Sequence, residues 1–220
     1  VSPVLREAMG RDAVAAARAV GYVGAGTVEF IVDRSGRHFF LEMNTRLQVE
    51  HPVTECVMGF DLVEWQIRVA AGEPLPLAQE QVAMRGHAIE VRLYAEDPYE
   101  GFAPQTGTVL HWRPDAALQP GIRIDHGLAE GSTVSPFYDA MVAKLIAHGR
   151  DRDDAIRRLR AALAAAPLLG LKTNARFLRA LLDHPTFRRG ETTTGWNRLL
   201  QLGISGIRKE AEEQLAKLDD

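Results

Sequence analysis

The 220-residue sequence predicts an α+β fold, in which mostly antiparallel strands are followed by helices. Three observations favour this class. Residues 27–44 alternate like a β-hairpin, and a second group of strand-like segments begins at residue 87 without regular strand–helix alternation. Helical periodicity with capping residues then dominates residues 151–183.

The first region, residues 1–83, is expected to contain two helices and one hairpin. Apolar residues recur at helical spacing from Val4 to Val20, and a second helix is expected from Asp61 to Ala71, ended by Gly72. Residues 21–26 are rich in glycine. Because they precede a strand and not a helix, we interpret them as turn and close-packing residues instead of a phosphate-binding loop.

The second region, residues 84–195, is expected to hold four strands followed by two helices. Asp151 is a suitable N-cap for a helix that runs through Ala166, and a shorter helix is expected from Asn174 to Asp183. The strands are expected at 87–95, 107–113, 122–126 and 141–148.

Composition excludes several classes of protein. A net charge of −3 gives no electrostatic footprint for nucleic acid. No apolar run approaches the ~20 residues that a membrane span requires. The single cysteine, Cys56, excludes an intrachain disulfide framework, which fits a reducing cytoplasm. We interpret it as a packed residue and not a nucleophile, since no base is apparent beside it.

The run from Leu41 to Glu55 is the most informative part of the sequence. In an extended segment every second side chain shares one face. An ordinary solvent-exposed strand would also alternate, but its polar face rarely carries such a mixed series of carboxylate, amide and guanidinium groups. The polar residues at alternate positions are Glu42, Asn44, Arg46, Gln48 and Glu50.

The hairpin expected at 27–44 also brings two carboxylates together. If Ser35-Gly36 is a two-residue loop, Glu29 lies directly opposite Glu42, with about 5 Å between their Cβ atoms. Such a pair repels unless one member is protonated or a cation lies between them. Asn44 adds a neutral oxygen ligand on the same face. Hard oxygen donors suit Mg²⁺ or Mn²⁺ and leave positions for phosphate oxygens and water.

Two long motifs carry a resemblance to a known family. Glu29 with Glu42-Met-Asn-Thr-Arg-Leu-Gln-Val-Glu-His51, followed by Arg85-Gly-His-Ala-Ile-Glu-Val-Arg-Leu-Tyr-Ala-Glu-Asp-Pro98, closely resembles biotin carboxylase, the ATP-grasp component of biotin-dependent carboxylases. The resemblance implies that residues 1–83 are the C-terminal part of an ATP-grasp domain. It also implies that 84–195 are a biotin carboxylase C-terminal domain, leaving 196–220 as a polar helical tail or linker.

For the first region the resemblance implies a metal site and a bicarbonate site. The residues that match the family's metal ligands are those derived from the hairpin, namely Glu29, Glu42 and Asn44. The residues that match its bicarbonate contacts are Arg46, Gln48 and, through its backbone, Val49.

Three residues are implied to be catalytic. Arg46 would hold bicarbonate and carboxyphosphate oxygens through its planar fork, with a structural salt bridge to Glu50 as the alternative. Glu50 matches the base that deprotonates bicarbonate. Arg92 matches the biotin-binding arginine that stabilises the enolate of biotin, with a pair to Glu90 as the alternative.

The implied reaction is the ATP-dependent carboxylation of biotin by bicarbonate through carboxyphosphate, within an acyl-CoA carboxylase. Its cofactors would be Mg²⁺ or Mn²⁺ and the biotin of a carrier protein. Its partners would be that biotin carboxyl carrier protein or domain, a carboxyltransferase subunit and a second copy of the chain in a homodimer.

One expectation and two alternatives complete this interpretation. The family's nucleotide-binding N-terminal domain and Gly-rich lid have no match in these 220 residues, so the chain alone is expected to be inactive. Two other functions stay open. One is another ATP-grasp ligase such as a carbamoyl-phosphate synthetase, against which the motif Arg85–Pro98 counts. The other is a non-catalytic dimerisation or scaffold fragment.

Overall fold

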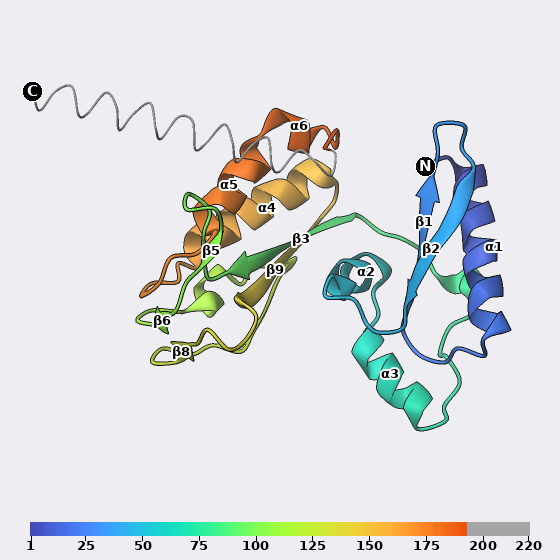
Figure 1. The fold of residues 1–220 in the computed structure, drawn as a ribbon, viewed down its shortest axis with the longest axis horizontal. Helices are drawn as coiled ribbons and strands as arrows, with labels where there is room; N and C mark the ends of the chain where they lie inside the picture. The colour runs from blue at the N-terminus through green and yellow to red at the C-terminus, as the bar shows by residue number, and fades with distance from the viewer. Residues whose placement is uncertain (193–220) are drawn as a thin grey trace, which may run out of the picture. The chain divides into compact units, whose positions relative to one another are not determined.

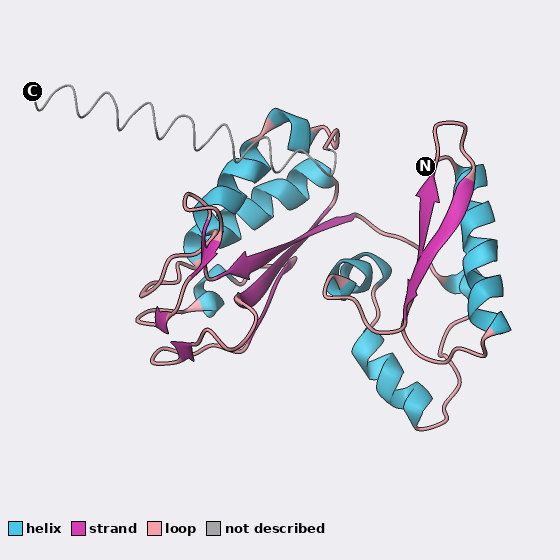
Figure 2. Cartoon of the chain, viewed as in Figure 1, coloured by secondary structure: helices cyan, strands magenta, loops and turns pink. Residues whose placement is uncertain are grey.

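The computed structural model describes residues 1–192 and divides into two compact units, Val1–Arg85 and a second that begins at Gly86. Each unit combines antiparallel strands with helices, which confirms the α+β class (Figure 1, Figure 2). No helix within the described part of the chain is both long and apolar enough to cross a membrane. The expected tail helix, Arg208–Leu218, lies outside the described residues.

The first unit contains one hairpin and three α-helices. The side-chain oxygen of Ser2 accepts a hydrogen bond from the N–H of Leu5 at 3.2 Å and so caps the first helix. Asp61 caps the third helix through the N–H of Glu64 at 2.8 Å. The elements are α1 (Pro3–Ala19), β1 (Thr27–Val32), β2 (His38–Asn44), α2 (His51–Met58), α3 (Leu62–Ala70) and a 3₁₀ turn at Gln79–Gln81.

Helix α2 corrects the sequence-based expectation of an extended segment after Asn44. Pro52 is expected to hold His51 in an extended conformation, yet both residues lie in the first turn of α2. A proline is tolerated there because its missing N–H would have no intrahelical partner. The strand therefore ends at Asn44, and the polar side chains after it do not share one strand face.

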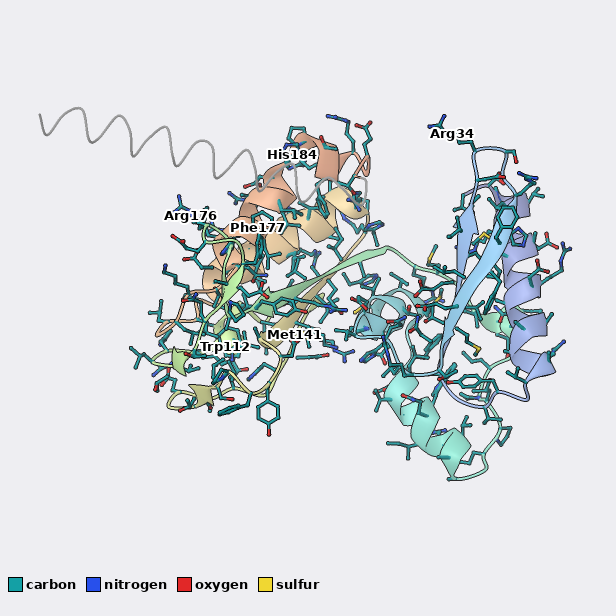
Figure 3. The ribbon with its side chains drawn as sticks, in the orientation of Figure 1. Arg34, Trp112, Met141, Arg176, Phe177 and His184 are labelled. Atoms are coloured by element: carbon teal, nitrogen blue, oxygen red, sulfur yellow. The ribbon has the colours of Figure 1, made fainter. Side chains whose placement is uncertain are left out.

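The turn of the hairpin also differs from the expected two-residue loop. The N–H of Gly36 donates to the carbonyl of Asp33 at 3.0 Å, and the N–H of Asp33 donates to the carbonyl of Arg37 at 2.9 Å. These bonds close a three-residue loop, with Arg34 at the tip of the hairpin (Figure 3). Next to the loop the strands therefore pair one residue away from the predicted register, so that Val32 lies opposite His38 and not opposite Phe39.

A β-bulge then restores the predicted register. Phe30 pairs with Phe40, whereas Glu29 pairs with Glu42, so Leu41 is the extra residue on β2. The prediction that Glu29 faces Glu42 is confirmed, although a three-residue loop and a bulge produce this register instead of a two-residue turn.

The first unit buries few side chains. Among residues 1–85, all of them described, only Pro52, Glu55 and Val57 are buried. Large apolar side chains are instead exposed on the hairpin, with exposed fractions of 56% for Ile31, 51% for Phe39, 59% for Phe40 and 52% for Leu41. The described part of this unit therefore has no substantial core of its own.

The second unit is built on a three-stranded antiparallel sheet in the order β3–β9–β7, with α4 packed against it. Two short strand pairs, β4–β5 and β6–β8, lie between β3 and β9 in the sequence. The elements are β3 (His87–Tyr94), β4 (Glu96–Asp97), β5 (Ala103–Pro104), β6 (Gly107–Thr108), β7 (Ile122–His126), β8 (Thr133–Val134), β9 (Met141–Gly149), α4 (Arg152–Ala165), α5 (Ala175–Asp183), α6 (Pro185–Arg188) and a 3₁₀ turn at Pro114–Ala117.

The main core of the described residues lies in this unit. Along β3, Ile89, Val91 and Leu93 are buried, while the side chains between them lie on the opposite face and are partly exposed. Helix α4 contributes Ile156 and Leu159 to the same core. The expected strands along β3, β7 and β9 and the helices α4 and α5 are confirmed, and their ends differ from the expected ones by about one residue.

Two expectations for the second unit are wrong in part. The strand expected at 107–113 stops at Thr108, and His111 forms only an isolated bridge with Leu169. A short helix, α6, follows α5 where no further helix was expected. Its N-cap His184 accepts a hydrogen bond from the N–H of Thr186 at 3.2 Å.

Candidate functional site

The three predicted metal ligands meet on one face of the β1–β2 hairpin. The side-chain nitrogen of Asn44 donates to Glu29 Oε1 at 2.8 Å and to Glu42 Oε1 at 3.2 Å. Both carboxylates therefore converge on one amide, which relieves their mutual repulsion. Glu29 is half-buried and Glu42 is exposed, so the pair lies at an accessible surface.

This donor set fits a hard divalent cation. Two carboxylates supply four oxygens, and the same amide turned over offers its own oxygen. Across residues 1–192 no group of three or more His, Cys, Asp or Glu side chains is arranged to hold a metal. Within the described residues the hairpin thus offers a cation two carboxylates and one amide.

Close packing before β1 fixes the backbone of this site. A Cβ atom at Gly26 would lie 2.9 Å from the ring of Tyr22 and 3.2 Å from the carbonyl oxygen of Asn44. The Tyr22 hydroxyl in turn donates to the carbonyl of Ala25 at 2.6 Å. The interpretation of residues 21–26 as turn and close-packing residues is confirmed, and only glycine fits at position 26 without displacement.

The segment between β2 and α2 carries the predicted bicarbonate residues. Arg46 is exposed and donates through Nη1 to the carbonyl of Leu47 and to Gln48 Oε1, both at 3.2 Å. Gln48 and Val49 are half-buried, and Glu50 is the exposed N-cap of α2, where its side chain makes no capping bond. The guanidinium and the Gln48 amide thus form a connected polar group beside the base candidate.

Glu55 is a structural residue that the sequence reasoning did not single out. Its side chain is buried, with 6% exposed, and Oε1 accepts the N–H of Leu62 at 2.8 Å. The same oxygen lies 3.0 Å from His51 Nδ1, at an angle unsuited to a hydrogen bond. The contacts tie α2 to the start of α3, which supports a packing role for His51. The spacing of four residues between His51 and Glu55 was the available signal.

Arg92 lies in the second unit, on the face of β3 opposite the core. Its Nη1 donates to the hydroxyl of Tyr94 at 3.2 Å. Across the sheet Arg92 is paired with Lys144 on β9, and Lys144 is paired with Asp125 on β7. The Lys144 ammonium lies 3.4 Å from Asp125. Arg92 is therefore one end of a charged row across three strands.

Asp125 keeps its charge within this row. Burial raises the pKa of its carboxyl, but the hydrogen bond and charge of Arg123 and the nearby Lys144 outweigh burial, so the pKa is lowered overall. Arg123 Nε donates to Asp125 at 2.8 Å. Sequence reasoning missed the contact between Asp125 and Lys144 because it depends on the register between β7 and β9.

A second pair of carboxylates lies beyond the end of β3. Burial, and then the charge of Asp139, raise the pKa of Glu96 above its ordinary value. Asp139 accepts the N–H of Met141 at 2.8 Å and so helps to start β9. No predicted site residue belongs to this pair, and its visible role is local.

Family models match both units. The biotin carboxylase C-terminal domain matches residues 90–198, and the ATP binding domain of the carbamoyl-phosphate synthase L chain matches residues 1–78. The first match contains Arg92. The second contains the hairpin and the segment that follows it.

Relatives that match most of the chain agree with these matches. The chain is 52% identical to the alpha subunit of mitochondrial methylcrotonoyl-CoA carboxylase of Arabidopsis thaliana, over 88% of the chain and 26% of that protein. It is 50% identical to the biotin carboxylase of Halalkalibacterium halodurans, over 89% of the chain and 43% of that protein. The chain thus spans less than half the length of these two relatives.

A solved structure shares the fold. The biotin carboxylase domain dimer of Hydrogenobacter thermophilus 2-oxoglutarate carboxylase, in complex with MgADP, ADP and bicarbonate, matches with a TM-score of 0.84 and 43% identity. The match covers 89% of this chain and 43% of that one.

Proposed function

Because the chain belongs to the biotin carboxylase family, we propose that it supplies the metal, bicarbonate and biotin residues of an enzyme that carboxylates biotin with ATP and bicarbonate. The observation that carries the proposal is the convergence of Glu29, Glu42 and Asn44 on one hairpin face. The polar segment with Arg46 and Gln48 follows directly along the chain.

The hairpin residues would hold Mg²⁺ or Mn²⁺. A divalent cation there would neutralise phosphate charge during transfer of the γ-phosphoryl group. Glu29 and Glu42 supply the anionic ligands and Asn44 the neutral one. The relative solved with MgADP supports Mg²⁺ over Mn²⁺ as the first ion to test.

The following segment would bind and activate bicarbonate. Arg46 presents an exposed guanidinium whose fork suits a planar oxyanion, and Gln48 already accepts one of its hydrogen bonds. The backbone N–H of Val49 is assigned as a further oxyanion donor. Glu50 is assigned as the base that takes the bicarbonate proton, so that the oxyanion attacks the γ-phosphorus of ATP, breaks its bond to the β,γ-bridging oxygen and forms carboxyphosphate with ADP as the leaving group.

Arg92 would act on biotin. Its guanidinium projects from the partly exposed face of β3, where it is held by the Tyr94 hydroxyl. A fixed cation at that place stabilises the enolate that forms when the ureido nitrogen of biotin becomes nucleophilic.

The organisation of the whole protein belongs to the same proposal. Residues 1–83 are assigned to the C-terminal part of an ATP-grasp domain, 84–195 to the biotin carboxylase C-terminal domain and 196–220 to a polar tail or linker. Biotin would arrive on a carrier protein or domain, and a carboxyltransferase subunit would pass the carboxyl group on to an acyl-CoA. A homodimer is proposed from the dimeric relative.

The proposed compartment is the cytoplasm. A single cysteine, Cys56, half-buried on α2, fits a reducing compartment. The Arabidopsis relative is mitochondrial, so fractionation of cells that express the full-length protein is the direct test.

A non-catalytic role is the second candidate. The first unit exposes Ile31, Phe39, Phe40 and Leu41, a surface suited to contact with further protein. A scaffold fragment would use that surface without turnover. Another ATP-grasp ligase is disfavoured, because residues 90–198 match the biotin carboxylase C-terminal domain.

Phosphate release separates these functions. A full-length protein that contains this sequence should release phosphate from ATP when bicarbonate is present, and biotin should stimulate the release. Glu50→Gln should lower that rate by roughly 10²- to 10⁴-fold, the usual contribution of a general base. Glu73→Gln removes the same charge elsewhere in the first unit and should leave the rate unchanged. The 220-residue chain alone should show no release, and a scaffold would show none in either form.

A further inference from the structure

Asn174 precedes α5 at the N-cap position but does not cap that helix with its side chain. N-cap asparagines usually accept a hydrogen bond from the first turn of their own helix. This side chain instead crosses to β3, where Oδ1 accepts the N–H of Tyr94 at 3.0 Å and Nδ2 donates to the carbonyl of Arg92 at 3.2 Å.

The backbone of Asn174 adds a third bond to the same strand. Its N–H donates to the carbonyl of Tyr94 at 3.1 Å. The side chain is buried, with 5% of the residue exposed, so water does not readily replace these bonds. Asn174 and α5 lie far along the chain from β3, and the contact is made only in the folded unit.

The position of β3 explains what these bonds do. β3 is an edge of its sheet, with β9 on one side only. An edge strand leaves backbone donors and acceptors unpaired on its outer side. The Asn174 amide has one donor and one acceptor, as a peptide group has. It therefore hydrogen-bonds to the outer edge of β3 as the backbone of a neighbouring strand would. The outer edge of β3 is thereby fixed at Arg92 and Tyr94.

The bonds from Asn174 also affect the position of the Arg92 guanidinium. Its guanidinium donates to the Tyr94 hydroxyl at 3.2 Å, so the residue that orients Arg92 is itself held by Asn174. On its other side the Arg92 backbone is paired with β9 at Lys144. The three hydrogen bonds from Asn174 to Arg92 and Tyr94 are called the Asn174 clamp below. The clamp holds the backbone of Arg92 directly and its guanidinium through Tyr94.

We propose that Asn174 is a positioning residue for biotin carboxylation, which sets the place of Arg92 through the outer edge of β3. This inference rests on the proposed role of Arg92. Asn174 itself touches no reacting group. Loss of the clamp should displace a guanidinium that must stand close to the biotin enolate, and a displacement of about 1 Å can lower a rate on the order of 10²-fold.

The test is a double-mutant cycle in the full-length enzyme. Asn174→Ala should lower kcat/KM for biotin by roughly 10- to 100-fold and spare bicarbonate-dependent ATP cleavage without biotin. In an Arg92→Ala background the same substitution should have little further effect, because it acts through Arg92. Asn174→Asp keeps an acceptor for the Tyr94 N–H but turns a carboxylate oxygen toward the Arg92 carbonyl, so it should not restore the rate.

Two controls exclude a merely structural effect. Leu182→Ala removes a fully buried side chain of the same helix, and at a matched loss of stability it should not reproduce the biotin defect. Hydrogen exchange of the Tyr94 amide should accelerate in Asn174→Ala, which checks that the clamp was removed.

The outcomes distinguish failure of the inference about Asn174 from failure of the proposed role of Arg92. If Arg92→Ala spares biotin carboxylation, the proposed function of Arg92 fails and the inference fails with it. If Arg92→Ala impairs biotin carboxylation but Asn174→Ala does not, the inference alone fails. Additive losses in the double variant, equal loss of biotin-independent ATP cleavage, or an equal defect in Leu182→Ala would also overturn it.

Discussion

Glu42→Gln should change stability and metal dependence in opposite directions. Glu42 faces Glu29 across the hairpin and receives a 3.2 Å hydrogen bond from Asn44. A glutamine keeps an oxygen that can accept this bond but removes the negative charge. Without a cation the substitution relieves repulsion, whereas in the presence of Mg²⁺ it removes an anionic ligand.

The two effects differ in size as well as in sign. A like-charge pair directly across two strands costs about 0.2–1 kcal/mol, so the metal-free protein should gain that much in its free energy of unfolding. Contacts to a charged group contribute about 1.5–3 kcal/mol net. Apparent Mg²⁺ affinity should therefore fall by roughly 10-fold to more than 100-fold.

Two assays in the full-length enzyme measure these effects. Denaturant unfolding without divalent ions reports the first, and the Mg²⁺ dependence of bicarbonate-dependent ATP cleavage reports the second. Glu73→Gln, with the same charge removed outside the hairpin, should change neither. An unaltered Mg²⁺ midpoint in Glu42→Gln would refute the assignment of Glu29, Glu42 and Asn44 as ligands.

Three further predictions concern other residues. Arg46→Ala should depress every bicarbonate-dependent step, whereas Arg92→Ala should impair biotin carboxylation more than biotin-independent ATP cleavage; equal losses in both assays would contradict this division. Burial, and then the charge of Arg152, lower the pKa of His87 below its ordinary 6.5. The unfolded chain then binds more protons between the two pKa values, so stability should fall as pH decreases below about 6.5, and His87→Gln should flatten this dependence in urea titrations. Leu182→Ala, at a position with 0% exposure, should lower the free energy of unfolding by about 2–5 kcal/mol in the same titrations, and a smaller loss would mean that the site collapses around the cavity.

Elements with a strong burial pattern could be predicted from the sequence. The apolar alternation along β3 corresponds to alternate burial of its side chains. The predicted cap of α4 is also present, because Asp151 accepts a hydrogen bond from the N–H of Asp154 at 2.8 Å. Helix α2 could not be predicted in this way. The residue before a proline favours an extended conformation on average, and here the helix start overrides that preference.

The candidate site was predictable only where it is local. Glu29, Glu42 and Asn44 meet because two adjacent strands pair, and sequence spacing contains that information. The expectation that Arg46 and Glu50 continue the same strand face was wrong, since β2 ends at Asn44. The bonds from Asn174 to β3 join residues distant in sequence, and no local pattern signals them.

The bulge at Leu41 also determines how this hairpin should be aligned with relatives of different length. On the side of the bulge away from the loop, Glu42 pairs with Glu29. Between the bulge and the loop, the strands pair in a register that differs by one residue. Loss of Leu41 would leave a regular ladder with the two carboxylates still opposite each other. In a shorter relative with the same three-residue loop, a one-residue gap therefore belongs at Leu41 and not in the turn, because that placement keeps the loop and the pairs between the loop and the bulge in equivalent columns.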